Sequence, residues 1–241
     1  MRALICLLLG ILILLSLAAA GLIWDGMKST YQTAPECQPV SDTISGKTDN
    51  RSYPSIDWRR WKTDRQSFVG WITVPGTRIN YPFVHASVED PGYYLDHDFW
   101  GDFNYYGCIF LDSGCSPTFL SMNSILYGHN MAWDNEMFGD LERYSDERFA
   151  KKHRRVLIQT PSTKRSYTIV ASTVIDGTRT DKRLAFDSYQ TFQSWWRKIY
   201  RGADIRLENA TPKRARILTL CTCSYHRWDN ERTLVFAIPD E

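Results

Sequence analysis

The chain has 241 residues, of which 43% are hydrophobic and 14% are aromatic. This length suits one large domain or two small ones, with enough chain to bury a sizeable core. The formal net charge of +2 gives no indication of nucleic-acid binding, and the sequence has no dominant basic run and no phosphate-binding glycine loop.

The N-terminus is the most apolar part of the chain. The 22 residues from Ala3 to Trp24 carry no charge, and a helix of that length would reach about 33 Å, enough for a bilayer core of about 30 Å. A secretory signal has an apolar region of only about 7–15 residues, although the small residues from Ala18 to Ala20 resemble a cleavage site. We therefore expect residues 1–24 to be a retained membrane anchor, with a cleaved signal as the alternative. Arg2 would keep the N-terminus in the cytoplasm and place the rest of the chain outside.

A polar segment follows the anchor. Residues 25–55 are rich in Ser, Thr, Pro, Gly and Asp and lack apolar periodicity, which is typical of a linker. The folded domain is expected to span residues 56–241. A short helix should open it, because four residues recur there at helical spacing: Trp58, Trp61, Arg65 and Phe68.

The rest of the chain is predicted to form mainly β-strands. Eight short apolar segments are separated by Gly, Pro, Asn and Asp, which is typical of a β-sandwich or β-barrel. These segments are residues 68–74, 79–84, 106–112, 123–129, 155–160, 166–175, 215–223 and 233–238. Two other segments, 135–153 and 183–202, have apolar residues at helical spacing. The sequence therefore predicts a mainly β fold with a few peripheral helices.

The seventh predicted strand contains the sequence "TLCTC". Residues two apart on a strand face the same side, so Cys221 and Cys223 share a face. Cys223 precedes a polar loop and is expected at the rim of the sheet, with Cys221 one step deeper. An antiparallel hairpin would then place Arg232 beside Cys223, where a guanidinium favours a thiolate or holds an oxyanion. Arg227, within the loop, is the alternative cation.

A thiol nucleophile needs a basic partner, because an ordinary thiol pKa of about 8.5 leaves only a few per cent of thiolate at pH 7. His129 is the favoured partner, since it ends a predicted strand and so lies at a rim. The alternative is that it is an ordinary surface or core histidine. The other histidines lie in loops or in polar, turn-like contexts: His85, His97, His153 and His226.

Three other interpretations of the cysteine pair stay open. Cys221, Cys223 and His226 could bind zinc, but zinc-binding cysteines usually have two to four residues between them and no fourth ligand is near. A Cys221–Cys223 disulfide would be strained on a single strand, yet it could cap a nucleophile. An exported barrel on a stalk would also suit a binding module with inert, buried cysteines.

Three sequence elements resemble the sortases, which are cysteine transpeptidases of Gram-positive bacteria. "TLCTC" matches the family's T-L-x-T-C signature, "LYGHN" matches its histidine motif, and Arg232 begins the next strand as the family requires. "GWITVPGTRINYPFV", "YYLDHDFW", "GCIFLD" and "HNMAWDNEMFGDLERY" resemble class B in particular. Cys221 departs from the pattern, because that position more often holds a small polar residue. The resemblance spans about residue 56 to the C-terminus. It implies an eight-stranded sortase-type β-barrel with an N-terminal helix and a helical insertion before the seventh strand.

The resemblance also implies roles. Cys223 would be the nucleophile that attacks the carbonyl after a threonine in a C-terminal sorting signal, His129 the general acid and base, and Arg232 the group that holds the substrate and the oxyanion. Three further residues would contact the substrate: Thr222, Tyr94 and Leu95. No metal or cofactor is implied.

The implied partners follow from this reaction. They are secreted proteins that carry sorting signals, and a peptidoglycan cross-bridge or its lipid-linked precursor as the amine. The substrate could be a haem-uptake protein or, in a pilin-polymerising enzyme, a pilin subunit. The domain would act on the outer face of the cell membrane.

Overall fold

A computed structural model describes Ser16 and residues 53–61, 67–131, 134–179, 183–207, 211–224 and 230–240. The predicted anchor, apart from Ser16, and most of the predicted linker lie outside these residues. The chain divides into two compact units, Met1–Glu36 and Cys37–Glu241. The description below concerns the second unit. No helix within the described residues is long and apolar enough to cross a membrane.

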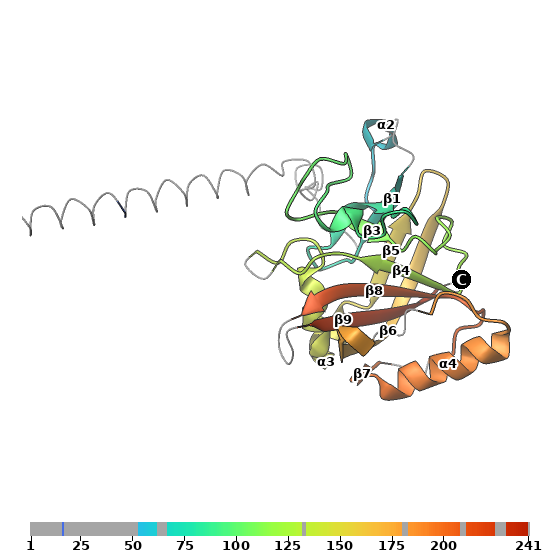
Figure 1. The fold of residues 1–241 in the computed structure, drawn as a ribbon. Helices are drawn as coiled ribbons and strands as arrows, with labels where there is room; N and C mark the ends of the chain where they lie inside the picture. The colour runs from blue at the N-terminus through green and yellow to red at the C-terminus, as the bar shows by residue number, and fades with distance from the viewer. Residues whose placement is uncertain are drawn as a thin grey trace, which may run out of the picture. The chain divides into compact units, whose positions relative to one another are not determined.

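The second unit is built mainly of strands (Figure 1). Its strands are β1 (Phe68–Thr73), β2 (Asn80–His85), β3 (Ile109–Leu111), β4 (Asn123–Tyr127), β5 (Arg155–Gln159), β6 (Lys164–Asp176), β7 (Ile205–Arg206), β8 (Ile217–Ser224) and β9 (Glu231–Pro239). The α-helices described are α2 (Trp58–Trp61), α3 (Glu147–Lys152) and α4 (Tyr189–Gly202). Short 3-10 helices cover Tyr93–Leu95, Gly139–Ser145 and Gly177–Arg179.

Eight of the strands form a closed barrel. The order around it is β5-β1-β2-β3-β4-β8-β9-β6, and pairing between β5 and β6 closes the ring. Two neighbouring pairs, β2–β3 and β4–β8, are parallel. The predicted eight-stranded barrel is therefore confirmed. The two-residue strand β7 was not predicted, because a strand that short has no hydrophobic pattern. It pairs with β6 at Ala171 and Ser172.

β8 separates two groups of buried side chains. Leu218 and Leu220 belong to the large cluster inside the barrel, whereas Ile217 and Cys221 belong to a second cluster that includes Phe192 of α4. This follows from the alternation of side chains along a strand. The helical insertion thus packs on the outer wall of the barrel (Figure 1), and the cysteines point to that outer face.

The predicted helices are present but shorter than the patterns suggested. α4 lies within the predicted segment 183–202, and the Ser188 side chain caps it by accepting a hydrogen bond from the backbone N–H of Thr191 at 3.1 Å. In segment 135–153, Asp146 ends the 3-10 helix and caps α3, so the segment forms two short helices instead of one. At the start of the domain, Phe68 belongs to β1 and not to the helix. That part of the helix prediction was wrong, because Phe68 pairs with β2.

Candidate active site

The β8–β9 hairpin brings a thiol and a guanidinium together. In the antiparallel register Cys223 lies directly opposite Arg232, and Ser224 lies opposite Glu231. Directly opposed residues on an antiparallel pair have Cβ atoms about 4.5–5.5 Å apart. The Arg232 side chain is half-buried, and its Nη1 atom donates to the Glu231 carbonyl at 2.9 Å. The predicted placement of Arg232 beside Cys223 is confirmed.

The parallel pairing of β4 with β8 brings in the imidazole. Tyr127 lies opposite Cys221 in this register, so His129, two residues further on, reaches the level of Cys223. Two hydrogen bonds hold the strands together just beyond the ladder: Gly128 N–H to the Cys221 carbonyl at 3.2 Å, and Thr222 Oγ1 to the Gly128 carbonyl at 2.8 Å. His129 is therefore fixed at the strand end, as its position in the sequence predicted.

One groove contains all three groups. Its volume is about 330 Å³, and its wall includes Cys223, His129 and Arg232 together with Leu95, Asp112 and Tyr127. The groove lies near the end of β8, and its wall includes Cys221 of the cluster that packs against α4. A thiol, an imidazole and a guanidinium around a single groove are the parts needed for covalent acyl transfer.

The two cysteines differ in exposure, as their positions along the strand predicted. Cys221 is 4% exposed and packs in the cluster beneath α4, whereas Cys223 is half-buried. Both are free thiols. Cys221 is part of the wall, and Cys223 is the thiol that a substrate can reach.

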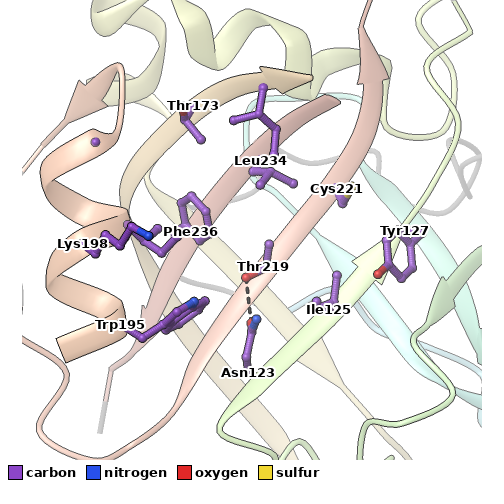
Figure 2. A pocket seen from close by; sticks show the side chains of 13 residues that line it. Asn123, Ile125, Tyr127, Thr173, Trp195, Lys198, Thr219, Cys221, Leu234 and Phe236 are labelled. Carbon is purple, nitrogen blue, oxygen red and sulfur yellow. Dashed lines mark hydrogen bonds between the residues drawn. The ribbon is translucent and has the colours of Figure 1, made fainter. Parts of the chain in front are cut away.

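A second, more apolar cavity lies next to the groove. It has a volume of about 260 Å³ and lies between α4 and the outer barrel wall. Figure 2 shows Trp195 and Lys198 of α4 facing Phe236, with Cys221 and Tyr127 on the opposite side. Tyr127 and Cys221 line both cavities, so the apolar cavity continues the groove away from Cys223.

A main-chain carbonyl orients His129. The Nε2 atom of the ring lies 2.6 Å from the carbonyl oxygen of Leu95. A carbonyl oxygen only accepts hydrogen bonds, so Nε2 carries the hydrogen. A neutral ring then has its lone pair on Nδ1.

The three residues expected to contact substrate differ in their access to the groove. Leu95 lines the groove, with 48% of its surface exposed. Tyr94 is 8% exposed and packs against Phe110 at a ring-centroid distance of 6.4 Å. Thr222 also borders the groove, but its hydroxyl donates to the Gly128 carbonyl. Leu95 is therefore the best placed of the three to touch a ligand.

Tyr127 and Asp112 are among the groove residues that were not predicted from the sequence. Tyr127 donates its hydroxyl to Asp112 Oδ2 at 3.0 Å, and both residues line the groove. Burial, together with the nearby Asp112 carboxylate, raises the pKa of Tyr127 well above its ordinary value. Tyr127 stays neutral and donates a hydrogen bond. Its position two residues before His129 on the same strand face was the available signal.

The other candidates do not join the site. His226 and Arg227 lie outside the described residues. His97 contacts Asp96 and the Tyr93 carbonyl, and His153 contacts the Pro75 carbonyl at 3.2 Å. His85 ends β2 and is not among the residues lining the groove. Within the described residues, no group of three or more His, Cys, Asp or Glu side chains is arranged to hold a metal ion.

The fold and this groove define a β-barrel protein in which a cysteine, a histidine and an arginine line one groove. A family model described as "Sortase domain" matches residues 72–240, and the chain belongs to the sortase family. It is 31% identical over 161 residues to sortase B of Listeria monocytogenes, covering 66% of this chain and 63% of that protein. It is also 31% identical over 160 residues to sortase B of Staphylococcus aureus, covering 66% of this chain and 64% of that protein.

Solved structures agree with this assignment. The Staphylococcus aureus sortase B–substrate complex superimposes with a TM-score of 0.64 at 28% identity, covering 73% of this chain and 81% of that chain. These relatives place the chain in class B. The matches span just under two thirds of the length of the two curated relatives.

Alkylation should distinguish the thiols. With limiting iodoacetamide at neutral pH, we expect Cys223 to react at least about tenfold faster than Cys221, Cys108 or Cys115, because only its side chain is substantially accessible. Burial also raises the pKa of the Cys115 thiol to about 11, so its thiolate is scarce. Peptide mass mapping of the labelled chain measures this. Equal labelling of Cys221 and Cys223 would contradict the described burial.

Proposed function

We propose that this class B sortase is a membrane-anchored cysteine transpeptidase. In this proposal it cleaves a C-terminal sorting signal after threonine and joins the new carboxyl end to a peptidoglycan amine. The observation that carries the proposal is the strand register, which brings Cys223, His129 and Arg232 to one 330 Å³ groove. The sortase B relatives give this arrangement its reaction class.

The first half-reaction forms a thioester. The Cys223 thiolate attacks the threonine carbonyl carbon, and negative charge develops on the carbonyl oxygen. Arg232, opposite Cys223 across the hairpin, stabilises that oxyanion. The C–N bond then breaks as protonated His129 gives its proton to the departing amine.

The second half-reaction returns the enzyme to its starting state. A primary amine attacks the thioester carbon, and neutral His129 takes the proton that the amine loses. The C–S bond breaks, an amide forms, and Cys223 leaves as a thiolate. A thioester suits this two-step route because it remains reactive towards amines.

The groove and the apolar cavity suggest how the signal binds. An extended peptide on the outer barrel wall would run past Tyr127 and Cys221, which line both cavities, and end with its threonine at Cys223. One solved relative is a sortase B–substrate complex, and another is sortase B complexed with triglycine, a peptide with a free amine. These complexes support a peptide donor and an amine acceptor for this chain as well.

The expected location also belongs to this proposal. Residues 1–24 would anchor the chain in the cell membrane, residues 25–55 would act as a stalk, and residues 56–241 would work on the outer face. That arrangement is supported by the 22-residue uncharged segment from Ala3 to Trp24. Both the secreted donor and a lipid-linked acceptor would then be within reach of the groove.

We expect Arg232 to contribute more to the reaction rate than to the stability of the fold. We expect Arg232→Ala to lower kcat/KM by about 10²–10³-fold, because an oxyanion donor is lost. Arg232→Lys should recover only part of this loss, because an ammonium lacks the planar fork of a guanidinium. Steady-state kinetics with a sorting peptide measures both, with Arg148→Ala, an exposed change on α3, as the matched control. Similar kinetics for Arg232→Ala and Arg148→Ala would remove Arg232 from the mechanism.

Product analysis tests the function as a whole. The full-length chain is incubated with threonine-containing peptides of varied sorting motif and with two acceptors, triglycine and a lysine-containing pilin-type peptide. We expect at least one donor to give a conjugate whose mass equals the donor fragment plus acceptor minus water. Preference for triglycine supports wall anchoring, and preference for the lysine peptide supports the pilin-polymerising alternative. If no donor is cleaved, the transpeptidase proposal is wrong and the alternative of a non-catalytic binding module is favoured.

A further inference from the structure

We infer that the main-chain carbonyl of Leu95 is the positioning group for His129, and that Gly107 is the residue that keeps this carbonyl in place. The inference rests on the proposed function for its kinetic consequence, but the contact itself is independent of it. The distance from His129 Nε2 to the Leu95 carbonyl oxygen is 2.6 Å. His129 and Leu95 are 34 positions apart in sequence, so the contact depends on the fold.

The hydrogen bond selects one form of the ring. With Nε2–H held by a carbonyl acceptor, a neutral His129 has its lone pair on Nδ1. In the proposed cycle Nδ1 gives a proton to the departing amine and later takes one from the incoming amine, while Nε2–H stays on Leu95. The carbonyl therefore acts through the imidazole and does not touch the reacting atoms.

The Leu95 turn is held from both sides by backbone hydrogen bonds. The Cys108 N–H donates to the Tyr94 carbonyl at 2.9 Å, and the Asn104 N–H donates to the Asp96 carbonyl at 2.9 Å. These bonds occupy the two neighbouring carbonyls and leave the Leu95 carbonyl directed to His129. Tyr94, which is 8% exposed, anchors the turn in the barrel core.

Gly107 packs directly against the carbonyls of this turn and leaves no room for a side chain. Its φ of +58° lies in the left-handed region that favours glycine. A Cβ at this position would lie 2.4 Å from the Tyr94 carbonyl oxygen and 2.8 Å from the Leu95 carbonyl oxygen. Backbone atoms cannot yield as a flexible side chain can, so any side chain at position 107 must displace the carbonyl that holds His129.

The test compares two glycine variants of the full-length chain. Gly107→Ala should displace the Leu95 carbonyl and lower kcat by about 10²-fold, because small displacements of a catalytic group carry large rate penalties. Gly76→Ala is the matched control. Gly76 also has a positive φ, of +80°, and its added Cβ would meet the His153 ring, which does not line the groove. The Gly76→Ala variant should lose about as much stability as Gly107→Ala, but its kcat should stay within about twofold of that of the unsubstituted chain.

A spectroscopic readout separates positioning from simple destabilisation. The chain is labelled with ¹⁵N-histidine, and the His129 ring signals are assigned by their loss in His129→Gln. At a pH where His129 is neutral, these signals should show a single Nε2–H tautomer. Gly107→Ala should give a mixture of both tautomers, and Gly76→Ala should not. An Nδ1–H tautomer in the unsubstituted chain overturns the inference, even if Gly107→Ala does not fold. Equal kcat for the two glycine variants overturns it too. Failure of the unsubstituted chain to transfer any peptide would count against the proposed function, while the tautomer would still decide the positioning role.

Discussion

Replacing Cys223 with alanine should reduce peptide transfer by about 10⁴-fold or more, because a covalent route cannot proceed without its nucleophile. The fold should survive. Cys223 is half-buried near the end of β8, and its removal should change the free energy of unfolding by about 1 kcal/mol or less. Rates of product formation by mass spectrometry and a thermal unfolding curve for each protein measure the two effects.

Cys221→Ala is the matched control for this prediction. Cys221 is 4% exposed and packs in the cluster beneath α4, so its replacement should lower stability by about 1 kcal/mol while most of the activity remains. The opposite pattern, with activity lost in Cys221→Ala and kept in Cys223→Ala, would mean that Cys221 is the nucleophile.

Replacing His129 with glutamine should reduce transfer of an amide donor by about 10²–10⁴-fold, the range for loss of a general acid and base. Glutamine keeps a side-chain N–H that can reach the Leu95 carbonyl, yet it cannot shuttle a proton. A donor whose leaving group needs no proton, such as an aryl thioester, should lose much less of its acylation rate than the amide donor. Stopped-flow release of the aryl thiol measures that step alone.

His153→Gln is the control here, because the His153 ring contacts the Pro75 carbonyl and does not line the groove. It should leave amide transfer unchanged within about twofold. If His129→Gln slows the thioester and the amide equally, His129 does not act through proton transfer to the leaving group.

The chemistry-bearing residues were predictable because they follow local rules. The order of residues along β8 placed Cys223 nearer the rim than Cys221, and the hairpin placed Arg232 opposite Cys223. His129 was found from its strand-end position, although its partner strand, β8, lies far away in sequence. In each case a short pattern and strand geometry determine where a side chain points.

The walls of the site were harder to predict, because they come from non-local contacts. Asp112 is positioned in the groove wall by its hydrogen bond to Tyr127. Leu95 lies on a 3-10 turn, which has no periodic pattern of apolar residues in the sequence. α4 packs against the face of β8 that carries Cys221 and forms one side of the neighbouring apolar cavity. The extent of a helix over a sheet cannot be read from spacing alone.

The most direct test of the central claim is the mass of the protein itself. The full-length chain is mixed with threonine-containing sorting peptides without an amine acceptor, quenched in acid, and analysed intact and after digestion. We predict an added mass equal to the donor fragment up to its threonine, located on Cys223, absent in Cys223→Ala, and released when triglycine is added. No adduct with any peptide, or an adduct located on another residue, would contradict a Cys223 thioacyl mechanism.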